Sequence, residues 1–496
     1  MMGGFPVLSA LLLLPVAGAI AVWLAPRPEQ ARAVAAGTVA AAFEVALAAV
    51  AGFDASNPGF QHLERAAWIP TLNVHYLVGV DGISLLFLPL SALLFLATVL
   101  ASWNSVRSLP RLYFSLLLLQ LAATLGVFVA LDAILFFLFW ELSLVPLYFL
   151  VGLWGVGPER RFAAARYTLL MLAAGVPLLF GFLLLAFNHA AAADAAIPAG
   201  LAFDLPTLLA TPASRGLQAL AFLLLLLGFA AKTPLFPLHT WLPQLAMEGP
   251  MAVTALLVGL KLGVYGLLRF AIPLAPEMAR ELHWLLAGLG TVGILYGSVA
   301  ALAQANLRGV LAYAGIGHVG LVLLGIASFS AAGLQGAVLQ TLNFTVVAGG
   351  LFLLAGFLHR RVGSTDALSL GGAAQTMPRL AAFFLLFSLA AIGVPGTSGF
   401  PAELLLVVSA LGSHTGAGIA ALFGMVIGAA YTLTLYRRAF LGPVTNPAIA
   451  QATDLRPAEL ALALGFALLI LAVGLAPSLF LDLIAPAADA WLARGR

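Results

Sequence analysis

The chain has 496 residues, of which 63% are hydrophobic and 8% are charged. A soluble domain carries about 25% charged residues, so this composition excludes a water-soluble globular protein and indicates a chain whose main solvent is the lipid bilayer. The absence of cysteine excludes disulfide bonds and iron–sulfur ligation by this chain.

In chain order, apolar runs long enough to cross a bilayer recur along the whole sequence. A transmembrane helix needs about 20 such residues, and the runs predict an all-α polytopic membrane protein of about fourteen transmembrane helices. The first run lacks a basic start and is interpreted as a helix rather than a cleaved signal. Residues 189–215 are interpreted as a long connection with room for a surface helix. The runs lie at residues 5–25, 33–52, 83–103, 112–130, 133–154, 167–188, 216–238, 251–272, 284–303, 308–330, 334–358, 379–410, 415–436 and 457–484.

Arginine placement predicts the orientation, because inside loops of membrane proteins carry an excess of basic residues. With an external N-terminus, 14 arginines lie inside and 6 lie outside. Both termini are therefore predicted on the outer face of a bacterial inner membrane, as an even number of helices requires. The six arginines on the outside are Arg65, Arg215, Arg269, Arg280, Arg494 and Arg496.

Every loop is under about thirty residues, so residues 1–496 are predicted to form a single transmembrane domain. The sequence has no P-loop, no G-x-G-x-x-G after a strand, and no His/carboxylate cluster with metal-ligand spacing. We therefore expect no cofactor, metal or nucleic acid to bind this chain. Its energy is expected to come from an ion gradient or from partner proteins.

The only two lysines, Lys232 and Lys261, lie inside apolar runs, whereas all twenty arginines lie in loops or near helix ends. A charge at the bilayer centre costs several kcal/mol, and such residues usually face a polar interior and serve function. Desolvation disfavours the ammonium form of lysine, while arginine stays charged. This distribution favours lysines that gain and release protons over lysines that snorkel or form static ion pairs.

Two glutamates match the lysines. Glu141 lies in ILFFLFWELSLVPLYFL and Glu403 in SGFPAELLLVVS, each near the middle of a long apolar run. A Glu–Lys pair can switch between ionised and neutral forms as its neighbours change charge. Glu44 also lies in an apolar run, but apart from this group, where it could face a partner subunit.

Two histidines add candidates for proton transfer. His318 lies in LAYAGIGHVGLVLLG, and imidazole titrates near neutrality and can pass a proton between its two nitrogens. A lone buried histidine is usually structural, but the other intramembrane titratable groups favour a relay role for His318. His239 follows Lys232 near a helix end, where a structural role and a relay role are equally compatible with the sequence.

Proline predicts two broken helices. Pro234 and Pro237 interrupt helix seven beside Lys232, and Val394-Pro395-Gly396 interrupts helix twelve ahead of Glu403. Bare backbone is tolerated at membrane depth only against protein or water. Paired interruptions five helices apart are typical of inverted repeats in transporters, although ordinary proline kinks would give the same residues.

The chain resembles the proton-translocating antiporter-like subunits of respiratory complex I. The resemblance covers roughly residues 75–440 and is greatest to the M-type subunit of the bacterial enzyme, the counterpart of mitochondrial subunit 4. That type has a glutamate at the position of Glu403, where its L-type and N-type relatives usually have lysine. The matching stretches occur in the same order and are HYLVGVDGISLLFLPL, FWELSLVPLYFL, KTPLFPLHTWLP, LLVGLKLGVYGLLR, NLRGVLAYAGIGHVG and VPGTSGFPAELLL.

The resemblance implies a fold of fourteen helices with two inverted five-helix repeats and broken helices seven and twelve. Helices one to three would occupy residues 1–110, the first repeat 111–275 and the second repeat 276–440, and helix fourteen and the C-terminus would occupy 441–496. NADH, FMN, iron–sulfur clusters and quinone would bind partner subunits. This chain would be a membrane-arm subunit of that NADH:quinone oxidoreductase and would move protons through the bilayer.

The resemblance also implies the roles of five residues. Glu141 and Lys232 would form the pair in the first half. Lys261 and His318 would link the halves along a hydrated axis, and Glu403 would be the terminal site in the second half.

The chain departs from the family pattern in one place that concerns the lateral proton path between His318 and Glu403. Relatives usually carry a second histidine in helix eleven, where this chain reads NFTVVAGGLF and places Phe344. Phenylalanine cannot relay protons, although Asn343 and Thr345 could hold water. The path between His318 and Glu403 is therefore expected to use water or to be impaired.

Three other functions compete with this interpretation. The chain could be a D-type subunit of a multi-subunit cation/proton antiporter, which shares these motifs. It could be a membrane module that energises a soluble partner, such as one for inorganic-carbon uptake. A purely structural anchor would leave the two buried lysines and two buried glutamates unexplained.

Overall fold

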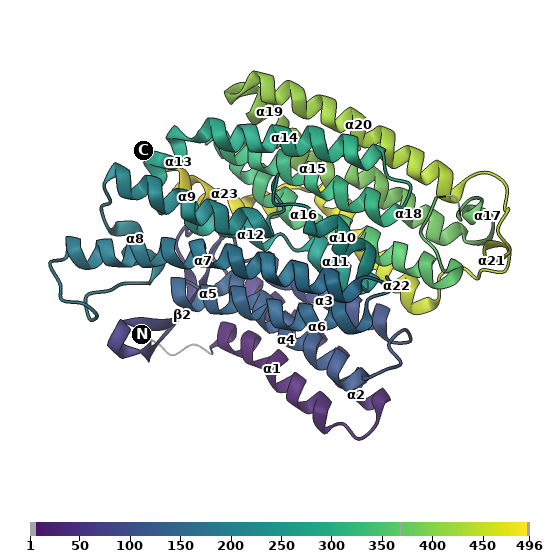
Figure 1. The fold of residues 1–496 in the computed structure, drawn as a ribbon, viewed down its shortest axis with the longest axis horizontal. Coiled ribbons are helices and arrows are strands. Elements are labelled where there is room, and N and C mark those ends of the chain that lie inside the picture. The colour runs from purple at the N-terminus through teal and green to yellow at the C-terminus, as the bar shows by residue number, and fades with distance from the viewer. Residues whose placement is uncertain (1–5, 368, 494–496) are drawn as a thin grey trace.

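The computed structural model describes residues 6–367 and 369–493, and these form a bundle of helices that run side by side (Figure 1). Twelve helical segments of the described chain are long and apolar enough to cross a membrane. The shorter apolar helix α3 and the interrupted pair α18–α19 bring the spans to fourteen. The prediction of an all-α membrane protein with about fourteen transmembrane helices is therefore confirmed.

Ten of these spans are single helices. They are α1 (Val7–Leu24), α2 (Pro28–Ala51), α3 (Phe87–Ser102), α4 (Pro110–Val129), α7 (Arg160–Ala192), α14 (His283–Leu302), α15 (Leu307–Ala327), α16 (Ala331–Val362), α20 (Thr415–Phe440) and α22 (Pro457–Leu475).

Three of the other four spans are made of two pieces each, and the fourth is made of three. They are α5 (Ala133–Leu142) with α6 (Leu144–Trp154), α9 (Arg215–Lys232) with α10 (Trp241–Glu248), α11 (Met251–Gly259) with α12 (Leu262–Gly266) and the π-helical turn η2 (Leu267–Ala271), and α18 (Pro378–Ala391) with α19 (Gly399–Ser413).

The breaks in helices seven and twelve lie where proline predicts them. Helix α9 ends at Lys232, immediately before Thr233-Pro234, and α18 ends shortly before Val394-Pro395. In the second break, Gly393 and Gly396 have φ angles of 67° and 88°, a backbone region that glycine adopts readily.

The break between α11 and α12 has no proline and is not evident in the sequence. Leu260 is extended (φ −95°, ψ 110°), so α11 ends at Gly259, two residues before Lys261. The broken segments touch, because a Cβ atom on Gly263 would lie 2.1 Å from the hydroxyl oxygen of Thr233 in the neighbouring break. Two interrupted helices thus meet inside the protein, where irregular backbone is tolerated at membrane depth.

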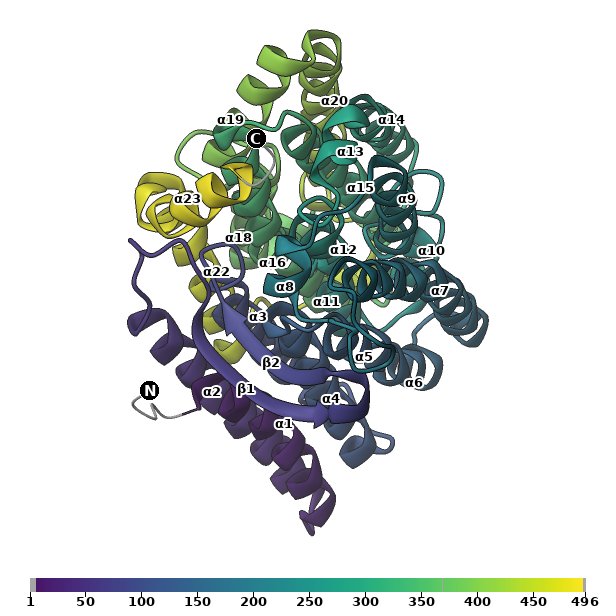
Figure 2. The same cartoon turned by 90° about the vertical axis from the view of Figure 1, so that its left-hand side faces the viewer.

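One end of the bundle, which we call the hairpin end, is covered by short elements (Figure 2). Strands β1 (Gln61–Ile69) and β2 (Val74–Val80) form an antiparallel hairpin closed by the 3-10 turn η1 (Pro70–Leu72). Asp132 caps α5 and accepts the backbone N–H of His75 in β2 at 3.0 Å, which ties the hairpin to the bundle. The start of α1 lies at this end too, because the backbone N–H of Leu8 donates to the carboxylate of Glu64 in β1 at 2.8 Å. The other elements here are α8 (Leu205–Ala210), α13 (Pro276–Glu281) and α23 (Ser478–Ala493).

Two expectations about connections have different outcomes. The long connection at 189–215 contains the short helix α8, as expected. The predicted run of 457–484 is wrong as a single helix, because α22 ends at Leu475 and α23 begins at Ser478. Pro477 explains the end, since proline disfavours a helical conformation of the residue before it. The indole N–H of Trp491 in α23 donates to the carbonyl of Leu268 at 2.7 Å.

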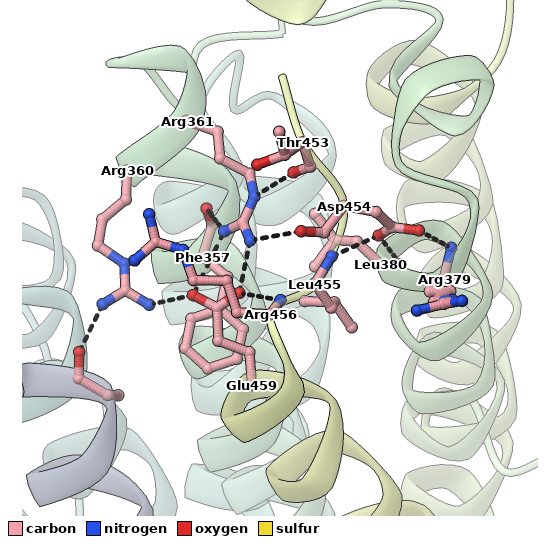
Figure 3. A network of polar contacts seen from close by, with 11 residues as sticks. Phe357, Arg360, Arg361, Arg379, Leu380, Thr453, Asp454, Leu455, Arg456 and Glu459 are labelled. Carbon is pink, nitrogen blue, oxygen red and sulfur yellow. Dashed lines mark hydrogen bonds and ion pairs between the residues drawn. The ribbon is translucent and has the colours of Figure 1, made fainter. Parts of the chain in front are cut away.

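The opposite end also carries α17 (Ala373–Thr376) and α21 (Pro447–Ala450). Here a polar network joins four transmembrane helices (Figure 3). Glu459 of α22 binds Arg360 at 2.8 Å and Arg361 at 2.5 Å, and both arginines belong to α16. Arg360 also donates to the carbonyl of Ala101 in α3 at 2.6 Å. Asp454 accepts the backbone N–H groups of residues 379 and 380 at the start of α18.

A buried ion pair fastens the hairpin end. Arg269 in the η2 turn binds both oxygens of Asp81, at 2.7 Å and 2.5 Å, and their side chains are only 4% and 7% exposed. Arg269 also donates to the hydroxyl of Tyr265 at 3.1 Å. This pair connects the segment after β2 to the eighth span.

We expect Asp81→Ala to destabilise the protein by about 3–5 kcal/mol, because it leaves the guanidinium of Arg269 buried without its partner. Thermal unfolding of the protein in nanodiscs measures the effect. The control is Glu281→Ala, which removes the exposed partner of Arg215 and should cost at most about 1 kcal/mol. Equal losses in the two variants would contradict the role of the buried pair.

Candidate functional site

Five of the six predicted site residues lie on or beside interrupted helices in the middle of the bundle. Glu141 is in α5, Lys232 ends α9, Lys261 lies between α11 and α12, and Glu403 is in α19. His318 is in the continuous helix α15. Lys232, Lys261 and Glu403 are buried inside this single chain, with 8%, 2% and 3% exposure.

Lys232 binds the end of the helix that carries Glu141. Its ammonium group donates to the carbonyl of Trp140 at 3.0 Å and to the hydroxyl of Ser143 at 2.9 Å. The nitrogen also lies 4.0 Å from the centroid of the Trp140 ring. The unpaired carbonyls and the dipole at a helix C-terminus both favour a cation, so the break at Ser143 creates the binding site for Lys232.

Glu141 lies on the same turn but does not form a direct ion pair with Lys232 in the described chain. Both of its carboxylate oxygens are buried and lack a hydrogen-bond partner among the described residues. The carboxylate lies against Gly175 of α7, where a Cβ atom would be 2.2 Å from Oε1. The space that holds this carboxylate therefore exists only because residue 175 has no side chain.

Lys261 is the third, in chain order, of the titratable groups Glu141, Lys232, Lys261, His318 and Glu403, which we call the line. Its amine is buried and has no hydrogen-bond partner among the described residues. It lies beside α15, 3.7 Å from where a Cβ atom of Gly315 would be, and 5.3 Å from the ring centroid of Phe344 in α16. An unpaired ammonium group inside protein is costly, so the charge of Lys261 depends on water and on the charges of its neighbours.

His318 and Glu403 form the other end of the line. Nε2 of His318 lies 4.0 Å from Oε1 of Glu403, and the histidine side chain is 23% exposed. Glu403 also lies against a glycine, because a Cβ atom on Gly393 would be 2.2 Å from its Oε2. Phe344 lies beside His318, with ring centroids 6.1 Å apart, and does not separate His318 from Glu403.

His239 is placed differently from the other five residues. It is 2% exposed in the connection between α9 and α10. Its ring stacks on Phe236 at 5.5 Å and contacts the edge of Tyr296 at 4.8 Å. Neither ring nitrogen has a hydrogen-bond partner among the described residues. These aromatic contacts favour a packing role for His239.

Three small cavities accompany the line. One of about 30 Å³ lies against Lys232 and Ser143. A second of about 40 Å³ lies between His318 and Asn343, and a third of about 20 Å³ lies between His318 and Glu403. Each exceeds the volume of about 10–15 Å³ that one water needs, so water fits beside Lys232 and between His318 and Glu403, whereas Glu141 and Lys261 line none of these three cavities.

Several residues of this site are not evident from the sequence. Ser143 and the carbonyl of Trp140 bind Lys232 only because α5 stops between them. Gly175 looks like an ordinary small residue of a membrane helix. Asn343 accepts the hydroxyl of Ser398 at 2.6 Å, which joins the position beside Phe344 to the break before Glu403. The only one of these residues with a signal in the sequence is Ser143, whose hydroxyl follows the buried Glu141 by two residues in the motif FWELS.

Comparison with known proteins gives consistent similarities. A family profile described as NADH:quinone oxidoreductase/Mrp antiporter, transmembrane, matches residues 130–428. The chain is 35% identical over 490 residues to the NADH-quinone oxidoreductase subunit M of Rhodobacter capsulatus, covering 97% of this chain and 95% of the relative.

Two solved structures are similar over nearly the whole chain. A chain of respiratory complex I from Thermus thermophilus with bound NADH matches with a TM-score of 0.90 and 33% identity, covering 99% of this chain and 100% of that one. A chain of the Mrp complex from Dietzia sp. matches with a TM-score of 0.85 and 25% identity, covering 98% and 97%.

We expect Gly175→Ala to reduce proton transport in membrane vesicles at least about tenfold, a loss equivalent to about 1.4 kcal/mol. The added methyl group would occupy the position of Glu141 Oε1 and displace the carboxylate. Gly465→Ala in α22 is the matched control, because a Cβ atom there has no neighbour within 4 Å. Similar activities of the two variants would show that the carboxylate does not need its present position.

Proposed function

This chain belongs to the transmembrane subunit family shared by NADH:quinone oxidoreductases and Mrp antiporters, and we propose that Glu141, Lys232, Lys261, His318 and Glu403 are its proton pathway. The chain is a membrane-arm subunit of a complex I-like NADH:quinone oxidoreductase, similar to the M subunit and to chain 4. Its activity is proton translocation coupled to quinone reduction in other subunits.

The observation that carries the proposal is the arrangement of the titratable groups. They lie on or against interrupted helices, are mostly buried, and are accompanied by cavities large enough for water. Permanently charged arginines lie at the two ends of the bundle, in the Arg269–Asp81 pair and the Arg360–Arg361–Glu459 network. Groups that can change charge therefore occupy the middle of the bundle, and permanently charged ion pairs stabilise its two ends.

The mechanism follows from the contacts of each group. When Lys232 is charged, the carbonyl of Trp140 and the hydroxyl of Ser143 stabilise it, and the field of Lys232 stabilises the ionised form of Glu141. When Glu141 takes up a proton, it loses the negative charge that stabilises the ammonium form of Lys232. Lys232 can then release its own proton toward Lys261 through water. Moving one charge against 100 mV requires about 2.3 kcal/mol, which the change at each pair must supply.

The lateral transfer in the second half can proceed without a histidine on α16. The 4.0 Å between Nε2 of His318 and Oε1 of Glu403 is too long for a hydrogen bond, so transfer from imidazole to carboxylate would pass through one water in the adjoining cavity. This arrangement favours the first of the two alternatives that the sequence leaves open, a path that uses water, over an impaired path.

The proposed organisation follows the positions of the breaks. The interrupted spans α9–α10 and α18–α19 support a division into helices one to three (1–110), two inverted five-helix repeats (111–275 and 276–440) and helix fourteen with the C-terminus (441–496). The arginine excess supports an orientation with both termini on the outer face of the bacterial inner membrane.

NADH, FMN, iron–sulfur clusters and quinone would bind partner subunits, and none of them would bind this chain. The described residues contain no group of three or more metal-ligating side chains that could hold an ion. The similarity to the Mrp complex supports a gradient-driven cation/proton antiporter as the second candidate, since the same buried pairs could exchange protons without electron transfer.

Isolation of the intact complex and identification of its subunits by mass spectrometry separates the two candidates. Flavin and iron–sulfur subunits are expected beside this chain. Only small membrane subunits would support the antiporter, and a single soluble non-redox partner would support a module that energises another process.

In the isolated complex, we expect Lys232→Ala to abolish most proton pumping while the complex remains assembled. The variant removes the cation bound at the end of α5 and leaves Glu141 without the charge that changes its proton affinity. Proton uptake per NADH oxidised, measured in reconstituted vesicles, tests this. Unchanged stoichiometry would exclude Lys232 from the pathway.

We expect Phe344→His to change the pumping stoichiometry by less than about twofold, because Nε2 of His318 already lies 4.0 Å from Oε1 of Glu403, with a cavity between them that can hold a water. The same vesicle assay measures it, with His318→Phe as the comparison that should block transfer. A large gain in Phe344→His would show that the path is impaired in the natural chain.

A further inference from the structure

Helix α2 presents an unusual face to the surroundings of the chain. It packs through Ala31, Ala35, Val39, Ala42 and Ala46, all buried against neighbouring helices α1, α3 and α4. Its opposite side is exposed and includes Glu44. No hydrogen bond or ion pair joins Glu44 to another described residue.

Glu44 lies within the hydrocarbon region rather than at the membrane surface. It precedes the last residue of α2, Ala51, by seven positions, or about 10 Å at 1.5 Å per residue. The 24-residue helix extends only about 3 Å beyond each side of a hydrocarbon core about 30 Å thick. The carboxylate is therefore several ångströms below the boundary, and glutamate lacks the long stem with which lysine and arginine reach the interface.

The residues within one turn of Glu44 on its face are small except for Leu47, which lies at the edge of that face. Ala33, Gly37, Ala40 and Ala48 lie within about 40° of Glu44 around the helix axis at 100° per residue, and a Cβ atom on Gly37 would meet nothing within 4 Å. Small residues let two membrane helices approach closely, and polar residues then form contacts between them.

Other exposed faces of the bundle have a different composition. Helix α7 exposes Leu169 and Phe180, and α22 exposes Leu468 and Leu475, with 58–73% exposure. Such large side chains are suited to lipid. The α2 face therefore combines a small-residue surface with an uncompensated carboxylate, and lipid satisfies neither feature.

We propose that the exposed face of α2 around Glu44 is the docking surface for a transmembrane helix of another membrane subunit, which places a lysine or arginine against the Glu44 carboxylate. The inference rests on the membership of this chain in a multi-subunit membrane complex. It does not depend on the proton-pathway residues, because Glu44 lies on a peripheral helix apart from that line. Charge complementarity selects the basic side chain, and the small residues provide the close approach.

Site-specific photocrosslinking in the assembled complex tests the occupant. A diazirine amino acid replaces Leu47, which is 45% exposed at the edge of the α2 face, and the same amino acid at Leu468 is the lipid-facing reference. The expected product at position 47 is a crosslink to a helix of another membrane subunit with lysine or arginine within one turn of the crosslinked residue. Adducts with phospholipid alone, or with a helix that lacks a nearby basic residue, would overturn the proposal.

Substitution of Glu44 tests the chemistry. Glu44→Leu is expected to lower the yield of assembled complex about threefold to tenfold, because it leaves the partner's cation buried without a counter-charge. A lipid-facing position would instead show an unchanged or higher yield, since leucine is suited to hydrocarbon. The amount of this subunit in membranes that lack the partner is the folding control and should stay constant. Glu44→Lys is expected to prevent assembly, and conversion of the crosslinked basic residue to glutamate should restore it.

The readout keeps this inference separate from the proposed function. Subunit association is measured on native gels, whereas the proton pathway is measured by pumping stoichiometry in vesicles. Normal assembly with Glu44→Lys would overturn the docking surface and leave the proton pathway intact. Failed pumping in Lys232→Ala complexes would have no bearing on Glu44.

Discussion

The central constraint on this protein is that a hydrocarbon environment offers no partner to free backbone groups or to charges. The chain meets it by placing its interrupted helices against one another inside the bundle. Thr233 in the break after Lys232 lies against Gly263 in α12, the helix that follows the break before Lys261. The carbonyls released at the end of α5 then receive the ammonium group of Lys232. The same interruptions that expose backbone therefore create the sites that hold the ionisable groups.

Space for those groups comes from glycine. The carboxylates of Glu141 and Glu403 each occupy a position that a Cβ atom of a neighbouring residue, Gly175 or Gly393, would fill. Glu141 is thus held against helix α7 and Glu403 against the break between α18 and α19, which leaves each carboxylate little room to move. Its proton affinity is then governed by nearby charges and by the water in adjoining cavities. Charge transfer between sites needs this sensitivity, and a fully hydrogen-bonded ion pair would oppose it.

Rigid contacts surround this adjustable middle. The Arg269–Asp81 pair fixes the hairpin end, and Glu459 with Arg360 and Arg361 fixes the opposite end. Arginine retains its charge in all these settings, so neither network changes as protons pass. The face of α2 around Glu44 differs from both, because it carries a carboxylate whose partner must come from outside the chain. The charges at both ends of the bundle thus have partners within the chain, whereas the α2 face around Glu44 is available to another subunit.

The sequence by itself determined the membrane class, the number of helices, the breaks at Pro234 and Pro395 and the buried titratable residues. Each of these depends on local properties, such as apolar run length, the missing N–H of proline and the cost of a charge in lipid. The tertiary structure alone decided the break before Lys261, the glycines beside both carboxylates, the separation of α22 and α23, and the contact between His318 and Glu403. These features arise from approach between distant segments, for which a single sequence has no local signal. Phe344 illustrates the difference, because its effect on the proton path depends on which groups already touch in space.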